Sequence, residues 1–387
     1  MNLRHLAAFI LIVSGTLAGL PACESSDWPD AIERTLDAAG DNRGELEAAL
    51  QQVPPQQVQG LQFLIVNMPE RDAQTLSAEF LLRNVDLAYQ AKAAAPWGDR
   101  IPEHVFLNGI LPYASINESR DDWRQNFRER FLPIVRNART PSEAAARLNQ
   151  TIFPQLNVKY STKRRRADQG PFESIQSGLA SCTGLSILLI DACRAVGIPA
   201  RFVGTPLWSD GSGNHSWVEI WDEGWHFTGA AEPTGDVLDK AWFTGRASGA
   251  VADDPRHAIY AVSFQKTPLT FPLVWDRKLN YVRAVNVTHR YVTAAQPLPE
   301  GHARVMFVAH TGPESDRVAA DIVVTDNDGT IVFEGRTRDE RFDRNDHLTA
   351  ILPLKKSYNA EFTRDTSTTR QSFQLIENGQ VIRGDLK

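Results

Sequence analysis

Cysteine is scarce in this chain, and long apolar runs and an excess of one charge sign are also missing. The 387 residues include three cysteines, of which Cys182 and Cys193 follow residue 23. Two cysteines do not make a disulfide framework. A helical period between them would hold their Cα atoms roughly 16 Å apart, whereas a disulfide tolerates about 7 Å. We therefore expect both thiols to be free.

The balance of charge argues against one class of partner. Lysine and arginine number 41 against 47 acidic residues, which gives a net charge of −6. Nothing in this balance favours nucleic acid or an anionic membrane surface as a partner. The composition, 42% hydrophobic and 23% charged, is ordinary for a folded protein. The length predicts two or three domains.

The first residues are typical of a secretory signal. Arg4 and His5 precede an apolar stretch at 6–20, which is too short for a comfortable membrane span, and Cys23 follows Leu-Pro-Ala. This cysteine resembles that of a bacterial lipobox. We expect a signal peptide at 1–22 and lipidation of Cys23, so that the exported protein is held at the membrane by acyl chains on the periplasmic or cell-surface side. An ordinary cleaved signal, with Cys23 incidental, is the alternative.

The rest of the chain divides into three regions of an α+β protein. Residues 24–135 carry apolar side chains near a period of 3.6, punctuated by prolines, and are predicted to be helical. Residues 136–298 read as a helix followed by strands. Residues 299–387 are strand and turn, with Asp-Gly and Asn-Gly pairs typical of hairpins, and predict a β-sandwich.

The two cysteines occupy positions of opposite character. Cys193 falls on an apolar stripe of helical period over residues 185–196, where a cysteine behaves as a small hydrophobic residue. Cys182 comes just ahead of this helix, where the positive end of the helix dipole stabilises a thiolate. We predict that Cys182 is a nucleophile and that Cys193 packs in the core.

A base for this nucleophile follows at His215. Residues 216–221 alternate as a strand, turn at 222–224 and return at 225–227. A histidine at the mouth of this hairpin can reach a thiol at a neighbouring helix tip, hold the thiolate as an ion pair and later protonate a leaving amine.

Four segments together resemble the core of the transglutaminase-like superfamily. They are residues 178–182, 194–204 (RAVGIPARFVG), 215–219 (HSWVE) and the Gly-Trp pair at 224–225. The resemblance covers roughly residues 140–245. It implies a papain-like core with an antiparallel sheet, here within 136–298, and a Cys–His–Asp triad that acts on amides by acyl transfer or hydrolysis. Cys182 and His215 match the nucleophile and the base.

The third member of the triad departs from this pattern. The family usually has an aspartate four residues after the tryptophan of the returning strand, and this chain has Gly229 there. Glu232 is the nearest acid downstream and is our predicted substitute; Asp236, Asp239 and the Asn214 amide are alternatives. The orienting residue modulates such a triad rather than defining it.

Two further residues are candidates for the cleft. Gln176 precedes Cys182 by the spacing of the glutamine that donates to the oxyanion in papain-like proteases, beside the backbone N–H of Cys182 itself. Trp217 either walls the cleft or packs in the core.

These residues predict a cysteine enzyme that acts on amide bonds of a protein or peptide substrate through a thioester at Cys182. Peptide hydrolysis, side-chain amide hydrolysis and transfer to an amine all fit, and hydrolysis is favoured because water is assured outside a cell. The alternative is a non-catalytic binding or scaffold lipoprotein that keeps the fold, which Gly229 supports. We expect no cofactor and no metal, because the thiolate of Cys182 and the imidazole of His215, even with Glu232, are too few ligands for a specific zinc site.

Overall fold

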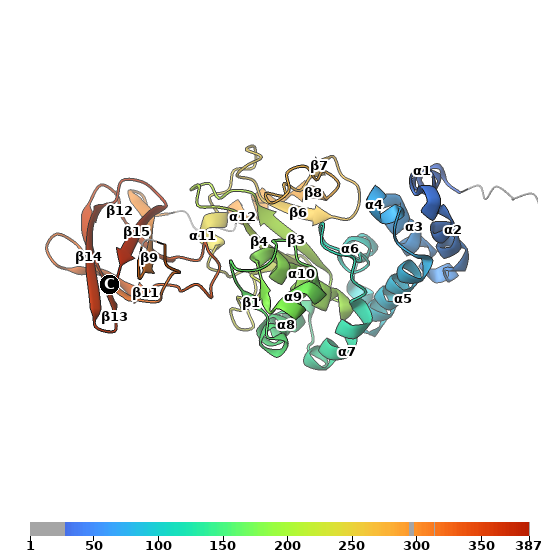
Figure 1. Ribbon diagram of the computed structural model, residues 1–387, viewed down its shortest axis with the longest axis horizontal. Coiled ribbons are helices and arrows are strands. Elements are labelled where there is room, and N and C mark those ends of the chain that lie inside the picture. Colours follow the sequence, from blue (N-terminus) through green and yellow to red (C-terminus); the bar gives the residue numbers. More distant parts are fainter. Residues whose placement is uncertain (1–27, 294–297, 313, 387) are drawn as a thin grey trace, which may run out of the picture.

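The computed structural model describes residues 28–293, 298–312 and 314–386. It is an α+β structure, as predicted, with 35% helix and 23% strand. The molecule is elongated, with N-terminal helices at one end, a mixed core in the middle and a β domain at the other end (Figure 1). The predicted signal peptide at 1–22 and the predicted lipidation site at Cys23 lie outside the described residues. Within the described ranges, no helix is long and apolar enough to cross a membrane.

The N-terminal region is mostly helical from Asp30 to Val135. Proline directly precedes several of its helical segments, because it tolerates the extended backbone there and cannot continue a helix. The helices are α1 (Asp30–Ala38), α2 (Arg43–Gln52), α3 (Val58–Asn67), α4 (Glu70–Ala73), α5 (Ala78–Ala94), α6 (Glu103–Gly109) and α7 (Arg124–Val135), with short 3-10 turns at Gly40–Asn42, Pro55–Gln57 and Gly98–Arg100.

The core follows with a helix whose start is visible in the sequence. Thr140 Oγ1 accepts a hydrogen bond from the Glu143 N–H at 3.2 Å, and proline occupies the first helical position. The elements are α8 (Pro141–Leu156), β1 (Lys159–Tyr160), α9 (Pro171–Ser177), β2 (Leu179–Ala180), α10 (Cys182–Ala195), β3 (Ala200–Thr205), β4 (His215–Trp221), β5 (Trp225–Thr228), α11 (Thr244–Ala247), β6 (Tyr260–Ser263), β7 (Leu269–Thr270), β8 (Arg283–Asn286) and α12 (Thr288–Thr293).

The central sheet has the order β5-β4-β3-β6-β8-β7 and is antiparallel throughout. Helix α10 packs on one face, in a hydrophobic core that continues into the N-terminal helices. A second cluster that includes Trp208, Trp217, Phe243 and Tyr291 covers the other face. Because side chains alternate along a strand, β4 sends neighbouring residues into both layers.

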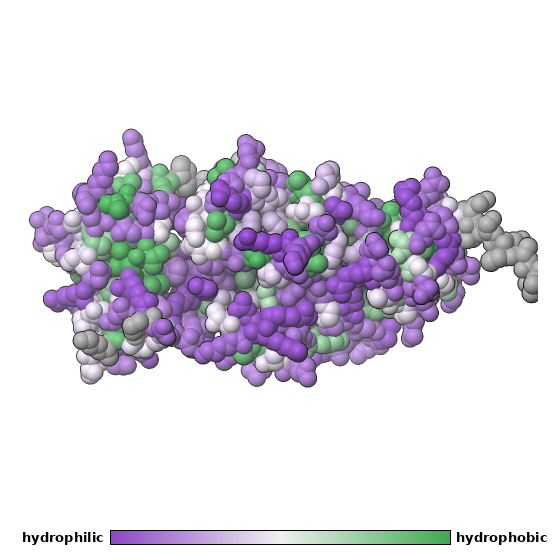
Figure 2. Space-filling view, turned by 45° about the horizontal axis from the view of Figure 1, so that its top comes forward, coloured by the Kyte–Doolittle hydropathy of each residue, from purple (hydrophilic) through white to green (hydrophobic). Residues whose placement is uncertain are grey.

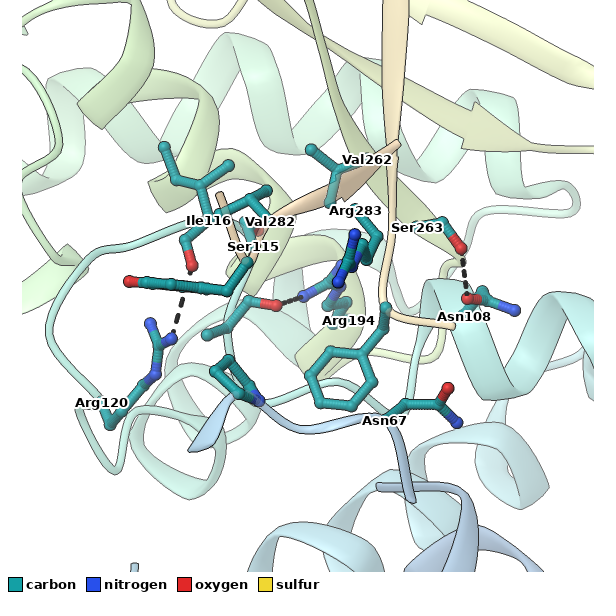
Figure 3. Close-up of a pocket in the computed structure, with 14 residues that line it drawn as sticks. Asn67, Asn108, Ser115, Ile116, Arg120, Arg194, Val262, Ser263, Val282 and Arg283 are labelled. Carbon is teal, nitrogen blue, oxygen red and sulfur yellow. Dashed lines mark hydrogen bonds between the residues drawn. The ribbon is translucent and has the colours of Figure 1, made fainter. Parts of the chain in front are cut away.

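Two buried arginines join the N-terminal helices to the core. Arg124 on α7 donates to the carbonyls of Ile110 and Pro112, and Arg194 on α10 donates to those of Pro112 and Ala114. Arg194 also lines a cavity of about 30 Å³ (Figure 3). Since buried carbonyls need partners, these arginines fix an irregular segment between helices.

The C-terminal domain consists of two facing sheets, as predicted. One has the order β11-β10-β13-β14; in the other, β12-β9-β15, strand β15 runs parallel to β9. The expected hairpin across the Asp-Gly turn is present, with Val324 paired to Phe333 and Gly329 at φ +81°. The strands are β9 (His302–His310), β10 (Asp321–Thr325), β11 (Ile331–Arg336), β12 (Leu348–Pro353), β13 (Ser357–Arg364), β14 (Ser367–Gln374) and β15 (Gln380–Asp385).

The domain has its own hydrophobic core between the two sheets. Its surface also carries exposed hydrophobic residues, and Figure 2 shows hydrophobic side chains gathered over this end of a mainly hydrophilic face. Four exposed hydrophobic residues of this domain are Ile331, Ile351, Ile376 and Val381.

A segment of the β domain reaches onto the core. Residues 337–347, between β11 and β12, are hydrogen-bonded to it at three points. The Arg344 N–H donates to Tyr160 Oη at 2.9 Å, Asn345 Nδ2 donates to the Asn214 carbonyl at 2.8 Å, and Arg246 Nη2 lies 3.2 Å from His347 Nδ1. Asn214 directly precedes His215. The β domain therefore contacts the predicted catalytic residues, while helices α1–α4 lie toward the opposite end of the molecule (Figure 1).

Candidate active site

Cys182 is the first residue of α10. Ser181 caps the helix, with its Oγ accepting the Gly184 N–H at 3.2 Å. This cap fixes the helix start at the cysteine, so the sulfur lies at the positive end of the helix dipole. Cys193, on the same helix, is fully buried, and both thiols are free. The predicted packing of Cys193 and the absence of a bridge between the two cysteines are confirmed.

His215 opens strand β4, opposite Thr205 of β3. Only 2% of the residue is exposed, and its ring lies among aromatic side chains, with centroids 4.8 Å from Trp242 and 4.9 Å from Phe243. The next residue points to the opposite face, where Ser216 Oγ is 3.2 Å from Thr183 Oγ1 on α10. This contact ties the strand to the helix beside both predicted catalytic residues.

The structure brings Cys182 and His215 together and adds a third side chain. The Cys182 sulfur, a ring nitrogen of His215 and a carboxylate oxygen of Asp343 all lie within 4.8 Å of one another. His215 Nδ1 is 3.5 Å from Asp343 Oδ2. At this distance the contact is an ion pair rather than a well-formed hydrogen bond. A thiol, an imidazole and a carboxylate in this arrangement are the groups of a Cys–His–Asp triad.

The buried groups have displaced pKa values. Burial raises the pKa of the Cys182 thiol, the charge of Asp343 adds to the rise, and the Ser216 N–H opposes it. Burial also acts to raise the pKa of Asp343, but the charge of His215, the Asn345 N–H and the charge of Arg317 together hold it below its ordinary value. Asp343 is therefore a carboxylate, as a partner for an imidazolium must be.

Glu232, the predicted third member, has a different place. Its Oε2 accepts a hydrogen bond from Trp242 Nε1 at 2.8 Å and fills the space that a side chain at Gly229 would take, 2.2 Å from an ideal Cβ. Within the described residues, the ion pair of His215 is made by Asp343 and not by Glu232. Burial, Asp343 and Asp346 raise the pKa of Glu232 well above its ordinary value, which suits a protonated acid rather than an imidazolium partner.

The alternatives to Glu232 are engaged elsewhere. Asp239 contacts the surface ring of His226 at 2.6 Å, and Asp236 accepts a hydrogen bond from Gln150. Asn214 contributes its carbonyl to Asn345.

Neither predicted cleft residue lines the site in this structure. Gln176 is exposed on α9, and the described part of the chain shows no hydrogen bond from it to the site. Trp217 is fully buried; its indole stacks 5.9 Å from Trp208 and its Nε1 donates to Tyr291 Oη at 2.7 Å. The packing interpretation of Trp217 therefore fits the structure. Its indole also stacks on the His215 ring, with ring centroids 5.9 Å apart.

Two open cavities of about 410 Å³ each flank the 337–347 segment. Tyr160 and Phe342 line both of them. The first also contacts Leu185 in the first turns of α10, together with Glu232 and Asp343. The first cavity therefore lies beside Asp343 and the start of α10, at the seam between the core and the β domain.

Cys182, His215 and Asp343 also have the kinds of donor atom that bind metal ions. Sulfur, nitrogen and oxygen donors within 4.8 Å make a set of three, the number that catalytic zinc sites take from protein. The sequence alone offered a thiolate and an imidazole, with Glu232 as the third candidate; the structure offers Asp343 instead.

Comparison with known proteins agrees with the resemblance. Residues 129–229 match the family model of the transglutaminase-like superfamily. The chain contains a transglutaminase-like domain. Cys182 and His215 lie within the matched range and Asp343 lies outside it. No curated protein matches the chain significantly.

Solved structures show low similarity to the chain. A Cytophaga hutchinsonii protein provisionally described as a cysteine protease is 19% identical, with a TM-score of 0.25, over 28% of this chain and 38% of its own. Red sea bream transglutaminase is 8% identical, with a TM-score of 0.28, over 73% of this chain and 66% of its own. The Bacillus anthracis TIE protein is 13% identical, with a TM-score of 0.18, over 49% of this chain and 30% of its own. The chain thus spans less than two thirds of each.

Proposed function

We propose that this protein is a cysteine enzyme that cleaves or exchanges amide bonds, with Cys182 as nucleophile and His215 as base. The observation that carries the proposal is the convergence of Cys182, His215 and Asp343 within 4.8 Å. Three scattered residues of the right chemistry meet at the start of a helix, beside an open cavity. The transglutaminase-like match over residues 129–229 supports the same reading, because the superfamily includes cysteine-dependent enzymes.

The chemistry follows from the geometry. His215 takes the thiol proton, and the Cys182 sulfur attacks the amide carbonyl carbon to give a tetrahedral intermediate. The imidazolium then protonates the nitrogen, the C–N bond breaks, and an amine and a thioester result. Water, deprotonated by His215, releases a carboxylic acid and restores the thiol; an amine in place of water gives a new amide. Asp343 stabilises the imidazolium in each half-reaction.

We favour hydrolysis of protein or peptide amides over transfer. Water is always available as an acceptor outside a cell, and nothing among the described residues marks a separate amine site. We also propose that the chain is exported and anchored through a lipid on Cys23, on the strength of its first 23 residues. Fatty-acid labelling that is lost in Cys23→Ala would support the anchor, and equal labelling of both proteins would contradict it.

Two measurements on the full chain test the enzyme. The first is the pH profile of Cys182 alkylation by iodoacetamide, read by peptide-resolved mass spectrometry with buried Cys193 as internal reference. An ion pair gives a thiolate below the free-thiol value of about 8.5, and His215→Ala removes it. The second is incubation with a peptide library and hydroxylamine, against Cys182→Ala. New chain termini indicate peptide hydrolysis, deamidated glutamines indicate side-chain hydrolysis, and hydroxamates indicate a thioester.

One observation favours the second candidate, a binding or scaffold protein that keeps the fold. Burial and the Asp343 carboxylate both raise the pKa of the Cys182 thiol, which disfavours the nucleophilic form unless His215 is protonated beside it. A Cys182 that alkylates as an ordinary thiol in both the native chain and His215→Ala, with no product above the Cys182→Ala level, would establish this candidate and overturn the enzyme.

A further inference from the structure

The segment that delivers Asp343 to the site has no regular structure of its own. Residues 337–347 connect β11 to β12 without forming a helix or a strand. Two internal main-chain turn contacts are present, from the Phe342 N–H to the Asp339 carbonyl at 3.3 Å and from the Asp346 N–H to the Asp343 carbonyl at 2.9 Å. Such contacts leave most carbonyls of the segment to be satisfied from elsewhere, and an irregular segment placed by so few bonds would not hold a carboxylate in register.

Arg317, which precedes β10 in the same domain, supplies the missing partners. Arg317 is half-buried, and its two NH2 groups make five hydrogen-bond contacts, all to main-chain carbonyls of this segment. Nη1 donates to Arg344 (3.2 Å) and Asp346 (2.9 Å), and Nη2 donates to Asp339 (3.1 Å), Phe342 (3.0 Å) and Asp343 (2.8 Å). One side chain thus gathers the carbonyls on both sides of Asp343 around a single planar group.

The bond from Arg317 goes to the Asp343 main chain, so the carboxylate is left for His215. Asp343 Oδ1 accepts the Asn345 N–H at 2.8 Å, which orients the carboxylate with Oδ2 toward the histidine. Asn345 in turn reaches the Asn214 carbonyl. The segment is therefore held from inside its own domain by Arg317 and from the core by Asn345.

We propose that Arg317 is a positioning residue of the active site: by binding five carbonyls of the 337–347 segment, it holds the Asp343 carboxylate at His215 across the domain seam. This inference rests on the function proposed above. A lysine cannot replace it, because an ammonium is a point donor and lacks the planar fork that reaches several acceptors at once. It follows that the β domain is part of the catalytic site and not an appendage.

A double-mutant cycle on the full chain tests this role. Arg317→Met and Arg317→Lys are each made in two backgrounds, the native chain and the Asp343→Ala variant. The rate of Cys182 alkylation is measured for every protein from pH 5 to 10. Arg336→Met, which removes an exposed arginine paired with Asp321 in the same domain, is the matched control. We expect both Arg317 variants to slow alkylation at neutral pH about tenfold, which is one pKa unit of lost thiolate stabilisation, and to shift the profile as Asp343→Ala does.

In the Asp343→Ala background, the Arg317 variants should change the rate less than twofold, because there is no carboxylate left to position. Equal losses in both backgrounds would overturn the inference and make Arg317 a structural residue. If Asp343→Ala itself leaves the profile unchanged, the proposed triad fails whatever Arg317 does.

A second variant covers the case in which Arg317→Met does not fold, as judged by thermal unfolding. Asn345→Ala removes the hydrogen bond of the segment to the Asn214 carbonyl of the core and should show the same dependence on Asp343. An Asn345→Ala effect that persists without Asp343 would count against the positioning of this segment.

Discussion

His215 Nδ1 and Asp343 Oδ2 lie 3.5 Å apart across the seam between two domains. The histidine opens a strand of the transglutaminase-like domain, and the aspartate comes from a connection within the β domain. Both side chains are almost fully buried, so their charges interact with little screening. In the proposed mechanism, the reactivity of Cys182 therefore depends on how the β domain docks.

Asp343→Asn should slow Cys182 alkylation at neutral pH by roughly tenfold to a hundredfold, less than the 10⁴-fold loss seen on replacing the aspartate of a serine-type triad. Asp343 has two opposing effects, since it stabilises the imidazolium and repels the thiolate. The imidazole lies 3.5 Å from the carboxylate, and we expect its stabilisation to win. The measurement is the alkylation rate against pH.

The matched control for this change is Asp346→Asn. Asp346 lies in the same segment, and its carboxylate is 3.5 Å from Arg338 rather than at His215. It should leave the rate within about twofold. Faster alkylation in Asp343→Asn would show that repulsion of the thiolate dominates, and would remove Asp343 from the triad.

Glu232→Gln should stabilise the protein progressively as the pH rises. The pKa of Glu232 is raised in the folded state by burial and by the carboxylates of Asp343 and Asp346. A carboxyl with a raised folded pKa binds more protons when folded, so the native protein loses stability as the pH rises above the unfolded value of about 4.3. Glutamine has no proton to lose.

The free energy of unfolding in urea at pH 4 and pH 8 tests this. The gain from Glu232→Gln should be near zero at pH 4 and should grow by roughly 1.4 kcal/mol for each unit of pKa elevation. A pH-independent difference would mean that Glu232 is ionised in the fold.

Cys193→Ala should cost stability without changing reactivity. The side chain is fully buried on α10, and its removal leaves a small cavity worth roughly 1–2 kcal/mol. Urea unfolding measures this loss. Because Cys193 faces the core rather than the helix start, the Cys182 alkylation profile should be unchanged, and a shifted profile would show that the two thiols are coupled.

Arg124→Met should destabilise the junction of the N-terminal helices with the core by about 3 kcal/mol or more. It leaves the carbonyls of Ile110 and Pro112, and Asn84 Oδ1, without this partner in a buried site. The exposed Arg130 on the same helix is the control, and Arg130→Met should stay within about 0.5 kcal/mol. Similar unfolding free energies for the two variants would contradict the structural role of Arg124.

Local patterns, together with the family resemblance, singled out Cys182 and His215 as the candidate nucleophile and base. Cys182 could be separated from Cys193 because an apolar stripe of period 3.6 predicts a buried helical face, and the cysteine ahead of it falls at the helix start. His215 was found from the alternation of the strand that it opens. In both cases the physical signal, helix or strand periodicity, spans a few residues.

Local patterns in the sequence did not identify the carboxylate that lies beside His215. Local spacing led to Glu232, and its carboxylate does fill the space beside Gly229, yet the ion pair of His215 is made by Asp343. Asp343 lies in a charged segment, 338–344 (RDERFDR), that reads as a solvated turn. No periodicity connects it to His215, and neither Arg317 nor Asn345 carries a motif.

The sequence by itself thus predicted most elements of this protein and its two free thiols, because each depends on near neighbours in the chain, and the resemblance to transglutaminase-like cores singled out Cys182 and His215 as a candidate pair. The tertiary structure alone decided which carboxylate meets the imidazole. That choice depends on the docking of two domains and on a guanidinium that gathers five carbonyls. Such contacts join residues far apart in the chain, and local patterns do not encode them.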